Sequence, residues 1–158
     1  MSKVAVIMGS ANDLEVMRDA ISTLKELGIE TVVGVYSAHR SPEMMLDFCR
    51  RIPETGIDVV IAGAGGAAAL PGMVAALTEI PVIGIPILGK SMNGLDSLLS
   101  IAQMPPGVPV ATMGVNAAKN AALLAGRIIA RYDSAVSQKM SEFILKQKKQ
   151  AAEKKLDV

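Results

Sequence analysis

One histidine is the most reactive group that this chain offers near neutral pH. His39 is the only histidine among 158 residues, and it lies in the segment YSAHRSP between Ser37 and Arg40. An imidazole can both donate and accept a proton near neutral pH. A hydroxyl and a guanidinium are common ligands of phosphate. The segment therefore predicts an acid/base group beside an anion-binding pair, while an exposed histidine next to a charge is the plainer interpretation.

A second polar segment, MGSAND, contains Ser10 and Asp13 directly after an apolar run. If a helix begins here, its free backbone N–H groups and the Ser10 hydroxyl can hold a phosphate. The same side chains are also good helix caps, and capping alone explains their types. The segment is neither a Walker A sequence nor GxGxxG, so it gives little support for ATP or a dinucleotide.

A third segment, AGAGGAAAL, brings together Ala64, Gly65, Gly66 and Ala67 after another apolar run. Glycine tolerates positive φ and lets a ligand reach bare backbone N–H groups. The segment predicts a small, mostly apolar pocket for a carboxylate or a small gas-like molecule. Close packing of a helix against a strand is the alternative reason for such small residues.

The remaining reactive types restrict the chemistry further. With one histidine and one cysteine, Cys49, the sequence predicts no metal site and no internal disulfide, and we expect Cys49 to be a buried helical residue in a reducing compartment. No GxSxG nucleophile sequence occurs. Lys90, Ser91 and Asn93 form a polar loop that is either a mobile cover for the site or an ordinary surface loop.

The elements that must position these residues follow from short apolar runs that lack polar alternation. Such runs are typical of parallel strands covered on both faces. We expect strands at 4–8, 31–36, 58–63, 81–87 and 108–113.

Amphipathic segments between the strands predict helices that cover both faces of the sheet. The expected helices span 13–28, 41–52, 70–79, 94–103 and 116–131. Gly28 suits the residue after a helix end, Ser41 suits an N-cap and Pro42 suits a first helical position. Alternating strands and helices predict a three-layer α/β fold with a central parallel sheet, in which the three polar segments converge at the carboxyl ends of the strands.

Composition and length indicate a single domain over residues 1–158, with a core of aliphatic side chains because aromatic residues make up only 3% of the chain. The formal net charge of +1 gives no general attraction to nucleic acid or to an anionic membrane. No apolar run reaches the ~18 to 20 residues of a membrane span, so we expect a cytoplasmic protein. Residues 134–158 are amphipathic at first and then rich in lysine, and we expect a C-terminal helix that contacts other subunits.

Four segments together resemble the class I N5-carboxyaminoimidazole ribonucleotide mutases of purine synthesis, which belong to the family of phosphoribosylaminoimidazole carboxylase catalytic subunits. They are VAVIMGSANDL, VYSAHRSPEMM, VVIAGAGGAAALPGM and NGLDSLLSIAQMPPGVPVAT, and the similarity extends over about residues 3–132. The resemblance implies a flavodoxin-like three-layer fold and a homo-octamer with active sites near subunit contacts. It also implies a ribonucleotide substrate and no cofactor, neither ATP nor metal.

The implied reaction moves a carboxylate from N5 to C4 of an aminoimidazole ribonucleotide through trapped CO2, with His39 as the proton carrier. The resemblance places the ribose and phosphate by Ser10, Asp13, Ser37 and Arg40, and the base and CO2 by a second group of residues. This second group is Ala64, Gly65, Gly66 and Ala67.

Two positions depart from the family pattern. Asn12 stands where relatives usually have a serine, and Ala69 stands where they commonly have a histidine. Asparagine and serine have similar hydrogen-bonding abilities, so we expect little effect of Asn12. Ala69 removes an imidazole, so His39 must supply all imidazole chemistry.

Two alternatives remain from the sequence. The class II enzymes carboxylate aminoimidazole ribonucleotide with free CO2, but they typically have SAHK and AGRSNA, so Arg40 and the pair Gly65 and Gly66 favour class I. A non-catalytic nucleotide-binding module would need the phosphate ligands but not His39.

Overall fold

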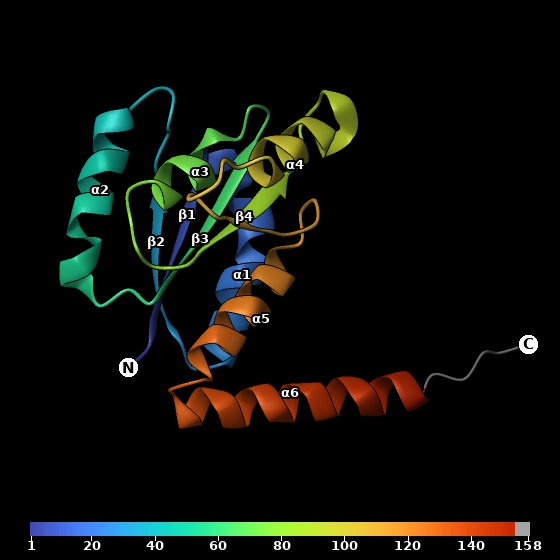
Figure 1. The fold of residues 1–158 in the computed structure, drawn as a ribbon. Coiled ribbons are helices and arrows are strands. Elements are labelled where there is room, and N and C mark those ends of the chain that lie inside the picture. Colours follow the sequence, from blue (N-terminus) through green and yellow to red (C-terminus); the bar gives the residue numbers. More distant parts are fainter. Residues whose placement is uncertain (154–158) are drawn as a thin grey trace, which may run out of the picture.

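The computed structural model describes residues 1–153, in which strands and helices alternate along the chain (Figure 1). The strands are β1 (Lys3–Met8), β2 (Glu30–Val35), β3 (Val59–Gly65), β4 (Val82–Ile87) and β5 (Ala111–Thr112). The helices are α1 (Leu14–Glu26), α2 (Pro42–Thr55), α3 (Ala69–Ala75), α4 (Leu95–Ala102), α5 (Ala118–Ile129) and α6 (Ser134–Glu153). Two short 3-10 turns, η1 (Ala11–Asp13) and η2 (Met92–Gly94), precede α1 and α4.

The five strands form one parallel sheet in the order β2-β1-β3-β4-β5. One core cluster lies between the sheet and α1, α5 and the start of α6. The other lies between the opposite face and α2, α3 and α4. This arrangement confirms the predicted three-layer α/β fold, and its strand order is that of flavodoxin-like proteins.

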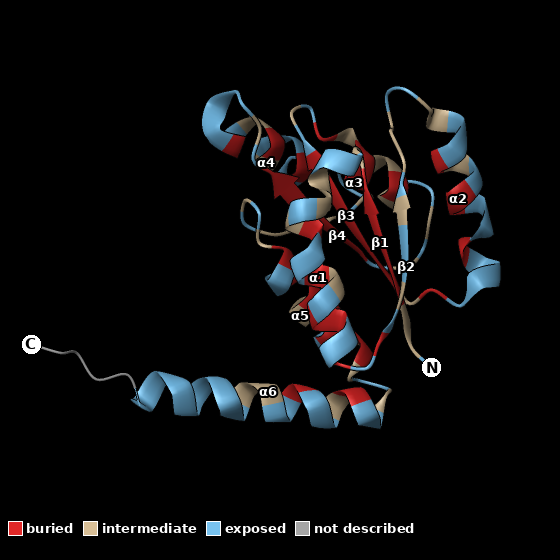
Figure 2. Ribbon diagram, turned by 180° about the vertical axis from the view of Figure 1, so that it is seen from behind, coloured by how far each residue is buried: buried red, intermediate tan, exposed pale blue. Residues whose placement is uncertain are grey.

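The continuous apolar runs of the central strands follow from burial on both faces. Every residue of β4 and all but the last of β3 are buried, as expected for strands that helices cover from two sides. The edge strand β2 differs, because Val33 and Val35 remain 47% and 46% exposed (Figure 2). One edge of the sheet therefore presents apolar side chains to its surroundings.

The helix ends agree with the sequence at Gly28, Ser41 and Pro42. Gly28 follows α1 with a φ of +74°, and Pro42 opens α2. Ser41 is the N-cap residue of α2, as predicted, but its hydroxyl contacts the Ser37 carbonyl at 3.5 Å and caps no free N–H of α2. Cys49 is buried on α2, as predicted.

Several elements are shorter than predicted, and β5 and α3 lose the largest share of their expected length. β5 is restricted to Ala111–Thr112 where we expected 108–113, since Pro109 has no N–H to pair with a neighbouring strand. α3 ends at Ala75 and not at 79, because Thr78 accepts a hydrogen bond from the Ile80 N–H (3.4 Å) and closes a turn.

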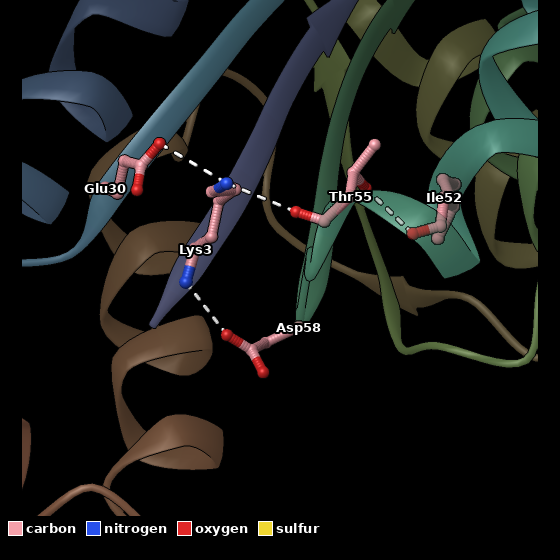
Figure 3. A network of polar contacts seen from close by, with 5 residues as sticks. All are labelled: Lys3, Glu30, Ile52, Thr55 and Asp58. Carbon is pink, nitrogen blue, oxygen red and sulfur yellow. Dashed lines mark hydrogen bonds and ion pairs between the residues drawn. The ribbon is translucent and has the colours of Figure 1, made fainter. Parts of the chain in front are cut away.

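A network of polar contacts joins neighbouring elements at the amino-terminal edge of the sheet (Figure 3). This edge lies opposite to the converging loops. The Lys3 N–H donates to the Asp58 carboxylate (2.8 Å), and the Lys3 ammonium pairs with Glu30 at 3.4 Å and donates to the Thr55 carbonyl at 3.2 Å. Lys3 thereby connects β1 to β2 and to the end of α2.

The first half of the last helix packs on the body. The Asp133 carboxylate accepts hydrogen bonds from the Ala135 and Val136 N–H groups and from the Ser2 hydroxyl. Val136 and Met140 are buried on the body, and the Lys119 ammonium of α5 lies 5.7 Å from the centroid of the Phe143 ring. The end of α6 projects beyond the body (Figure 1). None of the helices in residues 1–153 is long and apolar enough to cross a membrane. The last five residues of the predicted C-terminal segment lie outside the described residues.

Replacing Ser97 by alanine should destabilise the fold. Ser97 is fully buried on α4, and its hydroxyl lies 3.0 Å from both the Ile87 and the Gly94 carbonyl. Ser97→Ala leaves buried acceptors without their donor, which costs about 1 to 3 kcal/mol in the free energy of unfolding, measurable by urea denaturation. Ser100→Ala on the exposed face of the same helix is the matched control and should change stability by less than ~0.5 kcal/mol. Equal effects of the two substitutions would contradict this role of Ser97.

Candidate active site

A cavity of about 350 Å³ lies at the carboxyl edge of the sheet, where the loops after β1, β2 and β3 meet the start of α3. Its walls come from all three segments that the sequence singled out. The lining residues are Gly9, Ser10, Asp13, Ser37, Ala38, His39, Arg40, Ala64, Gly65, Ala68, Ala69 and Leu70.

Backbone hydrogen bonds hold the three loops together. The Gly9 N–H donates to the Gly63 carbonyl (3.1 Å), which joins the loop after β1 to the end of β3. The Tyr36 N–H donates to the Met8 carbonyl (2.8 Å), which joins the end of β2 to the same place on β1. These hydrogen bonds fix the points at which the loops leave the sheet.

In the first loop, Ser10 and Asp13 cap each other across η1. The Asp13 carboxylate accepts from the Ser10 N–H (3.1 Å), and the Ser10 hydroxyl accepts from the Asn12 N–H (3.3 Å). Burial raises the pKa of the Asp13 carboxyl above its ordinary value, and the hydrogen bond from Ser10 opposes that rise. Ser10 and Asp13 therefore cap the start of the helix and also line the cavity.

In the second loop, Ser37 organises the turn that carries His39 and Arg40. The Ser37 hydroxyl accepts from the Arg40 N–H (3.3 Å) and from the Arg40 Nε–H (3.1 Å). The Ser41 N–H donates to the Ser37 carbonyl (3.0 Å) and leads into α2. Arg40 is thereby held at the rim, and both His39 and Arg40 are exposed at the mouth of the cavity.

In the third loop, the small residues serve packing and access at the same time. A Cβ on Gly63 would lie 2.5 Å from the Met17 sulfur of α1, so this glycine permits close packing of helix and strand. Gly65 is exposed and lines the cavity. Gly66 and Ala68 have φ values of +62° and +38°, which turn the chain sharply into α3.

Not all predicted residues line this cavity. Gly66 and Ala67 lie in the loop but outside the lining, and the polar loop with Lys90, Ser91 and Asn93 does not reach it. The lining also includes Gly9, Ala38, Ala68 and Leu70, which we had not named. These four residues are neighbours in sequence of predicted residues. The backbone conformation of each loop determines which of its residues line the cavity, and the sequence does not reveal that conformation.

Several chemical groups thus surround one small space: an imidazole, a guanidinium, two hydroxyls, a carboxylate and a wall of glycine and alanine. The guanidinium and the hydroxyls suit a phosphate, and the carboxylate suits a sugar hydroxyl. Within residues 1–153, no three His, Cys, Asp or Glu side chains lie close enough together to hold a metal ion. The protein itself offers general acid/base chemistry on an anionic ligand.

Fold and cavity define a flavodoxin-like α/β protein with its ligand site at the carboxyl ends of the strands. Comparison with known families makes this specific, because residues 3–150 match the model of the AIR carboxylase family. The chain belongs to this family.

Individual relatives agree with this assignment. The chain is 58% identical to the N5-carboxyaminoimidazole ribonucleotide mutase of Saccharolobus solfataricus over 143 residues, which are 90% of each chain. It is 52% identical to the phosphoribosylaminoimidazole carboxylase of Saccharomyces cerevisiae over 147 residues, which are 93% of this chain but 26% of that longer protein. The crystal structure of Treponema denticola PurE superposes with a TM-score of 0.89 at 28% identity, covering 97% of this chain and 96% of that one.

The environment of Asp13 predicts a gain in stability when its charge is removed. Because its pKa is raised in the folded state, the folded protein binds this proton more tightly than the unfolded chain does, and stability falls as the pH rises through this interval. We expect Asp13→Asn to be at least as stable as the parent protein at pH 7, since the amide oxygen can still accept from Ser10. This advantage should shrink as the pH is lowered toward 4.

Thermal unfolding at pH 7 and at pH 4 measures this difference. Asp19→Asn, on an exposed position of α1, makes the same change in net charge and serves as the control. A lower melting temperature of Asp13→Asn at pH 7, with Asp19→Asn unaffected, would show that the Asp13 charge stabilises the fold.

Proposed function

We propose that the chain is an isomerase of purine biosynthesis that converts N5-carboxyaminoimidazole ribonucleotide into the isomer carboxylated at C4. The observation that carries the proposal is the single cavity that joins His39 and Arg40 to the glycine and alanine wall of the loop after β3. The relatives support the same activity, since one that is 58% identical is an N5-carboxyaminoimidazole ribonucleotide mutase.

The reaction requires one proton to leave and return. The bond between N5 and the carboxylate carbon breaks and releases CO2, while His39 delivers a proton to the departing nitrogen. C4 of the aminoimidazole ribonucleotide then attacks the CO2 carbon, and His39 removes the C4 proton to restore the aromatic ring. The imidazole ends in the state in which it began, so one histidine suffices and no cofactor is consumed.

The anionic part of the substrate would be held by side chains at the rim. Arg40 and Ser37 bind the phosphate in this proposal, since the Arg40 guanidinium forms only the Nε contact to Ser37 within residues 1–153. Asp13 and Ser10 bind the ribose. Asp13 has one carboxylate oxygen engaged by the Ser10 N–H, which leaves the other for a sugar hydroxyl.

The released CO2 must be kept from escaping and water must be kept out. The small residues Ala64 and Gly65 in the lining, with Gly66 and Ala67 next to them in the loop, leave room only for a compact ligand. Ala69 lies in the same lining, at the start of α3, where a histidine would bring a second imidazole into the cavity.

A homo-octamer with active sites near subunit contacts is part of this proposal. His39 is exposed in the single chain, although a reaction with trapped CO2 needs a covered site. The chain also exposes Val33 and Val35 on β2, Leu95 and Leu99 on α4, and the projecting half of α6. Neighbouring subunits would bury these apolar side chains and close the cavity.

The class I assignment rests on Arg40 and on the glycine pair at 65 and 66, where class II enzymes typically differ. A non-catalytic nucleotide-binding module is a weaker candidate because it has no use for His39 in the cavity. We further propose that the protein works in the cytoplasm, where a buried unpaired thiol such as Cys49 stays reduced.

The activity is tested with purified protein and N5-carboxyaminoimidazole ribonucleotide, without ATP, bicarbonate or added metal. We expect conversion to the C4 isomer, followed by absorbance and by chromatography of the product. Turnover only of aminoimidazole ribonucleotide with supplied CO2 would instead indicate a class II carboxylase. Turnover of neither would indicate a binding module.

Replacing His39 should remove the chemistry but keep the ligand. His39→Asn is expected to lower kcat by about 100-fold to 10,000-fold, the usual contribution of a general acid/base group. Binding of the ribonucleotide, measured by calorimetry, should stay within a few-fold because Arg40 and Ser37 remain. Undiminished turnover of His39→Asn would refute the assigned role.

Replacing Ala69 by histidine should change kcat in the direction opposite to His39→Asn. Ala69→His restores an imidazole beside the space assigned to CO2, and we expect kcat to rise if that imidazole helps to hold the carboxylate. Ala69→Leu is the matched control, since it adds bulk without a hydrogen-bonding group. Equal kcat values for Ala69→His and the parent protein would show that His39 alone is sufficient.

A further inference from the structure

Two of the four aromatic residues of the chain stack on one another directly beside the His39 loop. The sequence has two tyrosines, two phenylalanines and no tryptophan. The rings of Tyr36 and Phe48 lie with their centroids 4.7 Å apart and their planes 29° apart. Tyr36 is the last residue before the loop from Ser37 to Ser41, and Phe48 belongs to α2, the helix that follows this loop. The stack therefore joins the two ends of the loop that carries His39 and Arg40.

We propose that Tyr36 is a positioning residue for His39 and Arg40, and that its ring, through Phe48, fixes the loop between β2 and α2. The inference rests on the proposed function for its kinetic consequence, but its structural part concerns the loop alone. Tyr36 does not line the cavity, so it acts through its neighbours and not on the substrate.

The glycine at position 34 makes room for this ring. An ideal Cβ on Gly34 would lie 2.5 Å from Cε2 of Tyr36 and 3.0 Å from its Cζ, so the ring occupies the space into which any other side chain would project. Gly34 and Tyr36 are two residues apart and point to the same face of the sheet, the face covered by α2. The ring is thus placed over bare backbone on the strand and against Phe48 on the helix.

α2 is held to the sheet by side chains and not by close approach of the backbones, so the contact of Phe48 with Tyr36 is the side-chain link between the helix and the start of the loop. The helix stands further from the strands than α1, α3, α4 and α5 do (Figure 1). It is held through a row of buried side chains, Met45, Phe48, Cys49 and Ile52. Of these, Phe48 contacts the residue that precedes Ser37. Loss of the Tyr36 ring would free the start of the loop from α2.

The Tyr36 backbone is held by β1, so the side chain of Tyr36 restrains the turn that follows it and not the strand before it. The Tyr36 N–H donates to the Met8 carbonyl (2.8 Å), so β2 remains paired with β1 up to this residue. The following turn is closed within itself by the contacts of Ser37 with Arg40 and Ser41. The turn can therefore move as a unit with α2, which would carry His39 and Arg40 away from the Asp13 side of the cavity.

The tyrosine hydroxyl has no hydrogen-bond partner within residues 1–153, so the ring and not the hydroxyl carries this role. This distinction supplies a conservative variant, because Tyr36→Phe keeps the ring and the stack. Tyr36→Leu removes the ring but keeps an apolar side chain. Gly34→Ala keeps the tyrosine at position 36, but the added Cβ takes the space of its ring and displaces the ring.

The test measures kcat and KM of full-length Tyr36→Leu, Tyr36→Phe and Gly34→Ala for the mutase reaction. We expect kcat/KM to fall roughly 10-fold to 100-fold for Tyr36→Leu and Gly34→Ala, since misplacing a reacting group by about 1 Å can cost ~100-fold. The fall should lie mostly in kcat, with a smaller rise in KM from Arg40. Tyr36→Phe should stay within about twofold of the parent protein.

Val82→Ala is the control for a general loss of stability. Val82 is buried in the same core cluster at the start of β4, at the end of the sheet opposite to the cavity. Its truncation should lower the melting temperature yet leave kcat/KM within about twofold. A loss of kcat/KM in Val82→Ala as large as that in Tyr36→Leu, or full kcat/KM in Tyr36→Leu, would overturn the inference.

Hydrogen exchange separates this inference from the proposed function. Backbone amides of residues 37–41 should exchange faster in Tyr36→Leu than in Tyr36→Phe or the parent protein, whether or not the protein turns over the ribonucleotide. If the parent protein lacks mutase activity, the proposed function fails while this comparison still decides the role of Tyr36. Unchanged exchange in Tyr36→Leu overturns it.

Discussion

The parallel pairing of β1 with both β2 and β3 is the constraint on which the site depends. Because β1 lies between these two strands, all three end at one edge, and the Met8 and Gly63 carbonyls accept the Tyr36 and Gly9 N–H groups there. The sheet alone therefore brings the starts of the three loops together. Space at this edge is restricted most at Gly63, where a Cβ would lie 2.5 Å from the Met17 sulfur.

Small residues at this edge permit both the close packing of a helix on the strand and the access of a ligand to the backbone. Gly63 faces α1 and lets Met17 approach the strand, whereas Gly65, two residues later, is exposed to the cavity. The same short segment therefore contributes to the core with one glycine and to the ligand space with the next. This dual use explains why packing and ligand access could not be separated from the sequence.

The sequence correctly predicted those structural features that depend on a single strand or helix. Continuous apolar runs predicted the strands, and local backbone preferences placed Gly28 and Pro42 correctly. It failed where a distant or competing partner decides, as when the Ser41 hydroxyl turns to the Ser37 carbonyl. The stack of Tyr36 on Phe48 was missed for the same reason, since a contact across twelve residues leaves no periodic trace in the sequence. Family resemblance supplied the proposed substrate and the particular proton transfers proposed for His39, whereas the residues alone predicted only an acid/base group beside an anion-binding pair.

The hydrogen bond from Ser2 to Asp133 has a practical consequence for anyone who handles this protein. It joins the second residue of the chain to the carboxylate that caps α6, so the beginning of the chain lies beside the base of the projecting helix. A purification tag fused ahead of Met1 would start within two residues of that contact and could redirect the helix. A tag after the carboxyl terminus would leave this contact untouched, and comparing the two fusions would reveal how far the contact sets the direction of α6.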